Sequence, residues 1–484
     1  MYTSTRKKLN YNASNCIIKG ISDDGGLFIY DKLNEFIIDE SLIDLSYQDL
    51  SFKILKFFLN DFDDDEINQV IEKAYNKVNF PVNILNVHNL NELSFMELYH
   101  GPTLAFKDMA LTILPNLLQV SKRKNNNNKT TLILTATSGD TGGAALSGFG
   151  NADNTKIIVL YPTEGVSKFQ EAQMHYYTNK NAMVFSVEGN FDDCQNLVKK
   201  IFTSSIQLKK LELSSANSIN IGRLIPQIIY YFYSYMQMVK CNNISFGDKI
   251  NVCVPTGNFG NILACYIAKE MGLYIDKIIC ASNENKVLTD FFTTYVYNKN
   301  RPFYITNSPA MDILISSNLE RLLYLVTDKN EEEVSKMMNN LKETGQFYLD
   351  DKYQSKLSCF LASSINKEDT VSLIKKCYEE HHYLIDPHTA VGYGAYLEHK
   401  DKLNGKTLIA STASPFKFIE TIDEIFNTNL DGIERINKIA NLTNQCVPNI
   451  LDEIYKKHYN KVVWSKAEME EKLRKLIGEL DESC

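Results

Sequence analysis

Cysteine pairs at the spacing of metal sites or redox motifs are missing from this sequence. Its ten cysteines are scattered, none forms a Cys-x-x-Cys pair, and most lie in apolar stretches. Single cysteines among apolar residues are typical of small buried side chains in a reducing compartment. The sequence therefore predicts neither a metal site nor a disulfide framework.

Long apolar runs and an excess of positive charge are absent as well. No run of about eighteen apolar residues occurs, so no transmembrane helix is expected. Residues 1–6 lack the apolar core of a secretory signal. The formal net charge is −8, whereas a nucleic-acid-binding protein has a basic footprint. We expect a cytoplasmic protein with no nucleic-acid or membrane partner.

What the chain does contain is typical of a folded protein of two to three domains. It has 484 residues, of which 44% are hydrophobic and 23% charged. Residues 1–92 mix short helical and strand patterns and predict a small α+β N-terminal domain. Residues 93–445 alternate strands, glycine turns and helices, which predicts an α/β region of parallel sheets with a smaller subdomain at about 135–220. Residues 446–484 predict a C-terminal helical tail.

Two local predictions bear on the candidate site. Residues 109–120 are rich in apolar side chains and predict one buried helix. Leu384 and Ile385 predict a short strand directly before the polar motif Asp386-Pro387-His388.

The first candidate for chemistry is Lys107, which lies between Phe106 and Asp108 at the start of the predicted buried helix. Burial removes water from the amine and favours its neutral, nucleophilic form. Such an amine can form a Schiff base with a carbonyl compound. The alternative is a lysine that extends to solvent and pairs with Asp108, which is the commoner arrangement for a single lysine.

The second candidate is the loop Gly257-Asn258-Phe259-Gly260-Asn261, between a predicted strand and a predicted helix. Two glycines let the backbone approach a ligand closely, and free N–H groups at a helix start bind phosphate. The loop is neither a Walker A motif nor a G-x-G-x-x-G fingerprint. An ordinary strand-to-helix turn is an equally good interpretation from spacing alone.

A third candidate is Ser138-Gly139-Asp140-Thr141, where hydroxyl and amide groups at a helix start suit a carboxylate or another anion. Helix capping by Ser138 or Asp140 explains the same residues without a ligand and is the better interpretation of this loop alone.

A fourth candidate combines Asn217, Ser218 and Arg223 at the start of a long apolar helix. The planar guanidinium can bind phosphate, and the neighbouring groups add donors. Alternatively, Asn217 or Ser218 caps the helix and Arg223 pairs at the surface. An arginine in so apolar a helix needs an anion, which favours the binding role.

Polar groups also follow the late predicted strands, at His388 and at Ser411-Thr412, where open α/β sheets place ligands. His388 alone is more often a hydrogen-bonded structural histidine than a catalyst. Taken together, an amine, two anion loops, an arginine and late hydroxyls fit pyridoxal phosphate acting on an anionic amino acid.

In this order, and over nearly the whole chain, these motifs resemble the threonine synthase family in its longer microbial and fungal branch. The resemblance implies a fold-type II pyridoxal-phosphate enzyme, related in architecture to the tryptophan synthase β chain. The motifs that carry it are Ser4-Thr5-Arg6, Asp24-Gly25-Gly26-Leu27-Phe28, His100-Gly101-Pro102-Thr103, Phe106-Lys107-Asp108, Thr137-Ser138-Gly139-Asp140-Thr141-Gly142, Asn217-Ser218-Ile219-Asn220 with Arg223, Gly257-Asn258-Phe259-Gly260-Asn261 and Asp386-Pro387-His388-Thr389.

The resemblance also implies roles for these residues. Lys107 would carry the cofactor and act as the catalytic base. Thr412 would hydrogen-bond the pyridine nitrogen, with Ser411 as the fallback. The remaining groups would bind the cofactor phosphate (Gly257, Asn258, Phe259, Gly260, Asn261), the substrate carboxylate and the cofactor's 3′-oxygen side (Ser138, Gly139, Asp140, Thr141) and the substrate phosphate (Asn217, Ser218, Arg223).

The implied reaction converts O-phospho-L-homoserine and water to L-threonine and phosphate by γ-elimination and β-addition of water, within the aspartate-family pathway. The expected assembly is a monomer or homodimer. Gly165-Val166 replaces a basic residue and isoleucine of the family, and Ser414 replaces its histidine. The alternatives are a related phospho-lyase that gives 2-oxobutyrate and phosphate, and a catalytically inactive relative.

Overall fold

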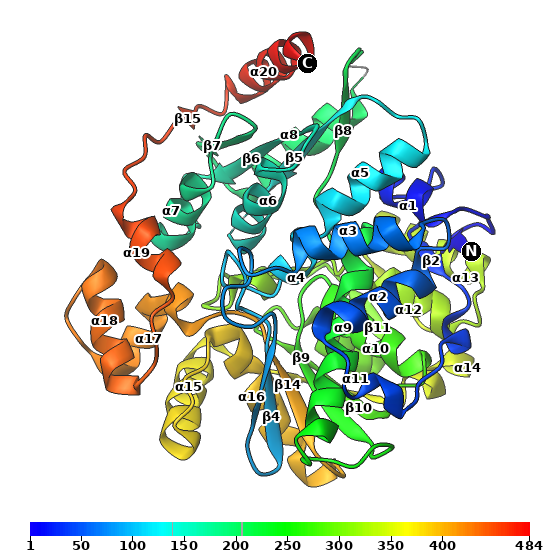
Figure 1. The fold of residues 1–484 in the computed structure, drawn as a ribbon, viewed down its shortest axis with the longest axis vertical. Coiled ribbons are helices and arrows are strands. Elements are labelled where there is room, and N and C mark those ends of the chain that lie inside the picture. The colour runs from blue at the N-terminus through cyan, green and yellow to red at the C-terminus, as the bar shows by residue number, and fades with distance from the viewer. Residues whose placement is uncertain (138, 205–206) are drawn as a thin grey trace.

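The N-terminal region of the computed structural model, which describes residues 1–137, 139–204 and 207–484, is a small two-stranded sheet surrounded by helices (Figure 1). The two strands are antiparallel, with Tyr2 opposite Tyr30. Each helix buries one apolar face, and a capping box between Asp63 and Glu66 starts the last of them. These elements are β1 (Tyr2–Ser4), α1 (Ala13–Lys19), β2 (Phe28–Tyr30), α2 (Tyr47–Phe58) and α3 (Asp64–Ala74).

The larger sheet has six strands in the order β13-β10-β9-β14-β4-β3, all parallel except the edge strand β3. Val252 and Val254 of β9 pack in one hydrophobic cluster and Cys253 in another. Because neighbouring residues of a strand point to opposite faces, helices must cover both sides of this sheet. Its strands are β3 (Asn86–Asn89), β4 (Leu93–Glu97), β9 (Ile250–Pro255), β10 (Ile275–Ser282), β13 (Phe360–Ser364) and β14 (Thr407–Ser411).

The smaller sheet has five parallel strands in the order β15-β7-β6-β5-β8. The tail contributes its edge strand β15, and the indole of Trp464 stacks on Phe185 with ring centroids 4.1 Å apart. The final helix then lies near α8 (Figure 1). The elements are β5 (Thr130–Ala136), α6 (Asp140–Gly150), β6 (Thr155–Pro162), α7 (Lys168–Tyr176), β7 (Ala182–Val187), α8 (Phe191–Thr203), β8 (Leu211–Ser214), β15 (Val463–Trp464) and α20 (Met469–Ser483).

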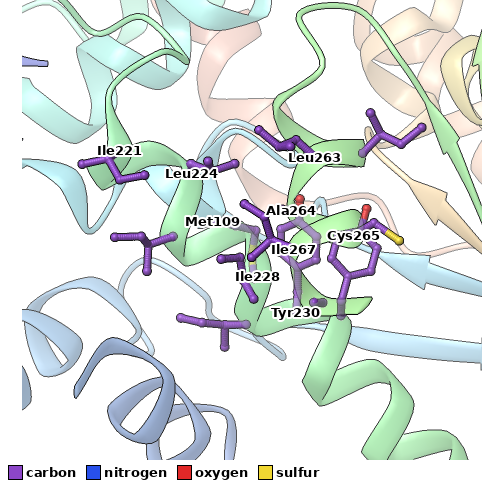
Figure 2. Packing of buried hydrophobic residues seen from close by; sticks show 14 of the residues in the cluster. Met109, Ile221, Leu224, Ile228, Tyr230, Leu263, Ala264, Cys265 and Ile267 are labelled. Atoms are coloured by element: carbon purple, nitrogen blue, oxygen red, sulfur yellow. The ribbon is translucent and has the colours of Figure 1, made fainter. Parts of the chain in front are cut away.

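Helix α9 (Ile221–Lys240) is the central helix of the main core and packs against α10 (Gly260–Glu270). Figure 2 shows Leu224, Ile228 and Tyr230 of α9 beside Leu263 and Ile267 of α10. Burial on most sides explains why the α9 sequence is apolar nearly all round. None of the helices within the described ranges is long and apolar enough to cross a membrane.

The remaining elements fill the connections between the sheets. Their bounds are α11 (Val287–Thr294), β11 (Val296–Asn298), α12 (Leu319–Val326), α13 (Glu331–Glu343), β12 (Gln346–Tyr348), α14 (Asp351–Gln354), α15 (Lys367–His381), α16 (Pro387–His399), α17 (Ile419–Phe426), α18 (Gly432–Thr443) and α19 (Asn449–Lys456).

Two local predictions were wrong. The helix predicted for residues 109–120 is two helices, α4 (Asp108–Leu111) and α5 (Leu114–Lys124). Pro115 explains the break, because it has no N–H and its ring would clash with the carbonyl of Leu111 in a continuous helix. Leu384 and Ile385 belong to no strand in the described part of the chain. Side-chain contacts hold that segment instead, since the Tyr383 hydroxyl donates to Glu97 at 2.8 Å.

Candidate active site

Lys107 lies directly before α4, where two loops from distant parts of the chain are fastened together. The N–H of Phe106 donates to the carbonyl of Thr412 at 2.8 Å, and the N–H of Ser414 donates to the carbonyl of Leu104 at 3.0 Å. The first loop follows β4 and the second follows β14, which are neighbouring parallel strands. The buried Lys107 and the buried Thr412 therefore meet at the carboxyl edge of the large sheet.

Asp108 shapes the turn that leads to Lys107. Its carboxylate accepts from the N–H of Thr103 at 2.8 Å and from the Thr103 hydroxyl at 2.6 Å. A Cβ atom at Gly101 would lie 2.5 Å from the Asp108 Cβ, so the turn leaves no room for a larger residue there. Burial raises the pKa of Asp108 to about 6, although the Thr103 hydrogen bonds oppose that shift. Asp108 supports the turn, and the lysine has a different acidic partner.

The amine of Lys107 faces Asp140, whose Oδ2 lies 3.7 Å from Nζ. Burial lowers the pKa of Lys107 to about 8, with further lowering by the charges of Lys417 and Arg223 and an opposing effect of Asp140. A lysine of ordinary pKa is almost entirely protonated at neutral pH. The lower pKa gives Lys107 a much larger neutral fraction, as Schiff-base chemistry requires.

Lys417 is a site residue that the sequence analysis missed. It lies in the 3₁₀ turn Pro415–Phe418, is fully buried, and donates to three oxygens. The acceptors are Asp140 Oδ1 at 2.9 Å, the Thr103 carbonyl at 2.8 Å and Gln173 Oε1 at 3.1 Å. A lysine between two phenylalanines in Phe416-Lys417-Phe418 was the available signal, and it is similar to the signal that identified Lys107, a lysine next to Phe106 in an apolar stretch.

The Asp140 carboxylate is hydrogen-bonded to other side chains of the protein. Besides Lys417, the side-chain amide of Gln170 donates to its Oδ1 at 3.0 Å. Burial raises the pKa of Asp140, but the charges of Lys417 and Lys107 outweigh it and hold this pKa far below the usual range. An ionised carboxylate repels another carboxylate, so the Asp140 side chain is not suited to face a substrate carboxylate, whereas the N–H groups at the start of α6 are. Ser138 lies outside the described residues, and Thr141 is half-buried on the first turn of α6.

The loop between β9 and α10 has the geometry of an anion site. A Cβ atom at Gly257 would lie 2.5 Å from the carbonyl oxygen of Ala310. The Gly257 carbonyl accepts from the Ser316 hydroxyl at 2.7 Å, and the Asn258 carbonyl accepts from the Asn318 side chain at 2.9 Å. With these carbonyls engaged from behind, the N–H groups that start α10 are free to bind phosphate.

Phe259 and Asn261 complete this loop. Phe259 has φ 62°, a left-handed conformation that bends the chain into the helix. Asn261 Oδ1 accepts from the hydroxyls of Tyr230 and Tyr231 at 2.7 and 2.5 Å. Its buried Nδ2 has no hydrogen-bond partner among the described residues. An unsatisfied buried donor next to a row of free amides fits the phosphate of the cofactor.

Arg223, within the first turn of α9, has the features of a second anion site. It is buried, and Nη1 donates to the carbonyl of Ala216 at 2.7 Å, while Nε has no partner in the described part of the chain. Burial lowers its pKa to about 10. A buried guanidinium without an acid is unfavourable unless a ligand supplies the anion. The capping alternative for Asn217 and Ser218 was wrong, because Asn220 is the cap and accepts from the N–H of Gly222 at 2.9 Å.

Asn318 and Arg321, which the sequence analysis also missed, join the two anion sites. The Asn318 side chain donates both to the Asn258 carbonyl and to the Ser218 hydroxyl, the latter at 3.3 Å. Arg321 donates to Asn318, to the Ile219 carbonyl at 2.6 Å and to the carbonyl of Phe28 at 2.8 Å. One hydrogen-bonded network therefore connects the loop of residues 257–261, called the phosphate loop below, with the start of α9 and with the N-terminal sheet. Asn217 itself is exposed.

His388 has a structural role. Its Nδ1 lies 2.8 Å from Asp386 Oδ2, and its Nε2 accepts from the N–H of Ala310 at 3.2 Å. The ring is thus assigned as the tautomer with its proton on Nδ1. It holds Ala310 against Gly257, in agreement with the structural interpretation of this histidine.

The two departures from the family pattern lie in different surroundings. Ser414 is buried beside the Lys107 loop, to which its N–H is bonded. Gly165 and Val166 lie before α7, where Gly165 has φ 97° and nothing lies within 4 Å of a Cβ built on it. Lys168 starts α7 and is exposed.

Comparisons with known proteins agree with this site. Residues 1–75 match the family described as threonine synthase N terminus, and residues 81–414 match the family of pyridoxal-phosphate-dependent enzymes. The threonine synthase of Schizosaccharomyces pombe is 35% identical over 90% of this chain and 92% of its own length.

Two solved structures are also similar. The yeast threonine synthase has a TM-score of 0.88 and 33% identity, covering 99% of this chain and 98% of its own. A threonine synthase from Brucella melitensis with bound pyridoxal phosphate has a TM-score of 0.87 and 31% identity, covering 98% of each chain. The predicted tryptophan synthase β-like α/β fold of the fold-type II class is confirmed. The chain belongs to the threonine synthase family of pyridoxal-phosphate-dependent enzymes.

Proposed function

We propose that this site converts O-phospho-L-homoserine and water to L-threonine and phosphate, with pyridoxal phosphate bound at Lys107. One observation carries the proposal. The buried amine of Lys107 lies in a site with two separate anion positions, the amide loop at Gly257 and Arg223, whose Nε has no partner among the described residues. One position suits the cofactor phosphate and the other suits a substrate that carries a phosphate of its own.

The chain offers a complete set of groups for the cofactor. Gly257, Asn258, Phe259, Gly260 and Asn261 would hold its phosphate through the amides at the start of α10. Thr412 would face the pyridine nitrogen. The fallback residue Ser411 is less suited, since its hydroxyl is already hydrogen-bonded to the hydroxyl of Thr389 at 3.2 Å. The bound cofactor supplies electron withdrawal from the substrate's Cα, which makes the Cα proton acidic.

Lys107 would move the protons of the reaction. As a neutral amine it would take the proton from Cα, return to the amine by giving that proton back to the reacting molecule or to the departing phosphate, and then take one from Cβ; each time it would become an ammonium that faces Asp140. Ser138, Gly139, Asp140 and Thr141 would orient the substrate carboxylate, in the case of Asp140 through its main chain alone.

Arg223, Ser218 and Asn217 would bind the substrate phosphate. A charged guanidinium in a dry site stabilises the negative charge that develops as the Cγ–O bond breaks. Because Asn318 bonds the loops of both anion sites, the two phosphates would be held at a fixed separation.

The organisation of the chain follows the same proposal. We assign residues 1–92 to an N-terminal domain, although β3 within this range pairs with β4 of the large sheet, 93–445 to the catalytic region and 446–484 to the tail, which contains β15 as well as helices. All ten cysteines are free, which supports a reducing compartment such as the cytoplasm. We further propose threonine biosynthesis in the aspartate-family pathway and a monomeric or homodimeric state.

The test is a product assay on the purified chain with O-phospho-L-homoserine and pyridoxal phosphate. Phosphate and threonine should form in equal amounts, and Lys107→Ala should abolish both together with the visible absorption of the bound cofactor. Formation of 2-oxobutyrate instead of threonine would establish the phospho-lyase alternative. Lys122→Ala is the matched control, since Lys122 is a buried lysine bonded to Thr131 at 2.8 Å.

A further inference from the structure

Lys417 is a buried cation that the reaction described above does not use. An ammonium group has three donors, and those of Lys417 all have oxygen acceptors within the chain. The acceptors come from the turn before Lys107, from α6 and from α7. With its donors filled, Lys417 has none left for a phosphate or a carboxylate of the substrate.

The carboxylate of Asp140 has two differently engaged oxygens. Oδ1 receives Lys417 at 2.9 Å and the Gln170 amide at 3.0 Å. Oδ2 is directed at the amine of Lys107, 3.7 Å away. The position of the second oxygen is therefore fixed by the partners of the first.

We propose that Lys417 is a positioning residue, which holds Asp140 by one oxygen so that the other faces Lys107 without capturing it as a permanent ion pair. The proposal rests on the function proposed above, in which Lys107 alternates between amine and ammonium. When the proton passes from Cα to Nζ, the C–H electron pair remains on the substrate and an N–H bond forms. Asp140 Oδ2 then accepts a hydrogen bond from the new ammonium and remains ionised.

The sign of each neighbouring charge decides whether it raises or lowers the pKa of Lys107. Arg223 and Lys417 disfavour the protonated form of Lys107, while Asp140 and Asp108 favour it. His388 also acts on Asp140 when it carries a charge. Neutralising Lys417 would leave the full charge of Asp140 directed at Lys107, which raises the pKa of that amine. Neutralising Asp140 would leave Lys417 unopposed and lower the pKa.

The first test measures Lys107 in the full-length chain without the cofactor. Competitive labelling with acetic anhydride, read by mass spectrometry across pH, gives the midpoint at which Lys107 becomes reactive. The wild-type midpoint should lie at about 8. Lys417→Met should move it upward by about one unit, which is a tenfold change in the neutral fraction. Asp140→Asn should move it downward, and Lys417→Met with Asp140→Asn should bring it back towards the wild type.

The second test follows the pH dependence of kcat in the cofactor-loaded enzyme. The acid limb should move to higher pH in Lys417→Met and to lower pH in Asp140→Asn. Lys122→Met is the matched control, because it removes a buried lysine whose acid partner is Glu212 and not Asp140. It should lower stability without moving either midpoint.

The outcomes separate the two proposals. Equal midpoints in all variants, or shifts of the same sign for Lys417→Met and Asp140→Asn, would overturn the positioning role. If Lys417→Met does not fold, Lys417→Gln replaces it in the same measurement and should give the same upward shift, because it also removes the charge that opposes Asp140. A wild-type chain that makes no threonine would count against the proposed function alone, because the labelling experiment needs no substrate.

Discussion

At the scale of single residues, the site is built around charges that the chain leaves partly uncompensated. Arg223 and Arg321 are both buried arginines, and burial lowers the pKa of each to about 10. Within the described ranges, Arg321 donates to three oxygens, whereas Arg223 donates to one and its Nε has no partner. The difference favours a structural role for Arg321 and supports the proposed ligand-binding role of Arg223.

Substitution of Arg223 should therefore weaken substrate binding without loss of stability, whereas substitution of Arg321 should lower the free energy of unfolding. Arg223→Met should raise the KM for O-phosphohomoserine about 10- to 100-fold, the loss of roughly 1.5–3 kcal/mol expected for hydrogen bonds to a charged group. It should leave the free energy of unfolding unchanged or raised, because an uncompensated buried charge is removed. Urea unfolding without ligand, together with steady-state kinetics, measures both quantities.

Arg321→Met is the comparison. It leaves three oxygens without their donors and should lower the free energy of unfolding by about 3 kcal/mol or more. Equal destabilisation by the two substitutions would contradict the assignment of Arg223 to a ligand.

The residues predicted from the sequence are those whose signal is local. Lys107 and Arg223 were recognised because each is a charge inside an apolar run. The position of Lys417 carried the same signal, but its meaning depends on Thr103 and Gln173, which lie 314 and 244 residues away in sequence. The Asp140 side chain was assigned a different role, because a helix cap, a substrate ligand and an ion-pair partner have the same appearance in a sequence.

At the scale of elements, the start of α10 depends on a glycine. The carbonyl of Ala310 lies where a Gly257 side chain would begin, and His388 holds Ala310 there. The loop can present its N–H groups only while this close approach is kept. Sequence spacing predicted the strand, the glycine loop and the helix, but not the Ala310 segment that packs behind them.

Gly257→Ala should therefore push the Gly257 loop and the Ala310 segment apart. A new Cβ 2.5 Å from a backbone oxygen forces one of them to move, and overpacking of this kind destabilises by about 1–3 kcal/mol. Affinity for pyridoxal phosphate should fall in parallel, as measured by equilibrium dialysis. Gly478→Ala is the matched control, since its Cβ meets nothing within 4 Å and helix propensity should stabilise by roughly 0.5–1 kcal/mol.

Element types were predictable where the hydrophobic period was strong. Strands β9 and β14 and helices α9 and α10 lie where the sequence predicted them, whereas strands β3, β4, β8 and β13 were not predicted individually. The break between α4 and α5 was missed because an apolar run outweighed a single proline in the interpretation. Strand β15 was missed because its two residues, Val463 and Trp464, are too few to show an alternating hydrophobic pattern.

At the scale of the whole molecule, both ends of the chain stabilise parts of the structure distant from them in sequence. The tail adds an edge strand to the small sheet, and Asp481 accepts from the N–H groups of Lys210 and Leu211 at 2.8 and 2.7 Å. At the other end, Arg6 forms a bidentate pair with Glu320, both contacts at 2.8 Å, and the Thr5 hydroxyl donates to the same carboxylate. Glu320 lies in the first turn of α12, next to the network of Asn318 and Arg321.

This connection predicts that a residue of the N-terminal domain controls cofactor binding. Arg6→Met leaves the nearly buried Glu320 without its cation, and loss of a hydrogen-bonded charge destabilises by about 1–3 kcal/mol. The start of α12 should loosen, so that Asn318 holds the phosphate loop less firmly. Affinity for pyridoxal phosphate should then fall several-fold, although Arg6 is assigned no contact with the cofactor.

The pair Arg301–Asp290 provides the control for this effect, because its arginine is about as exposed as Arg6 and its separation is 2.6 Å, but it joins a loop to α11. Arg301→Met should lower the melting temperature to a similar extent while cofactor affinity stays at the wild-type value. If the two substitutions weaken cofactor binding equally, the loss would reflect stability in general. A loss confined to Arg6→Met would instead mean that the N-terminal domain is part of the phosphate-binding scaffold, since a general loss of stability would weaken cofactor binding in both variants.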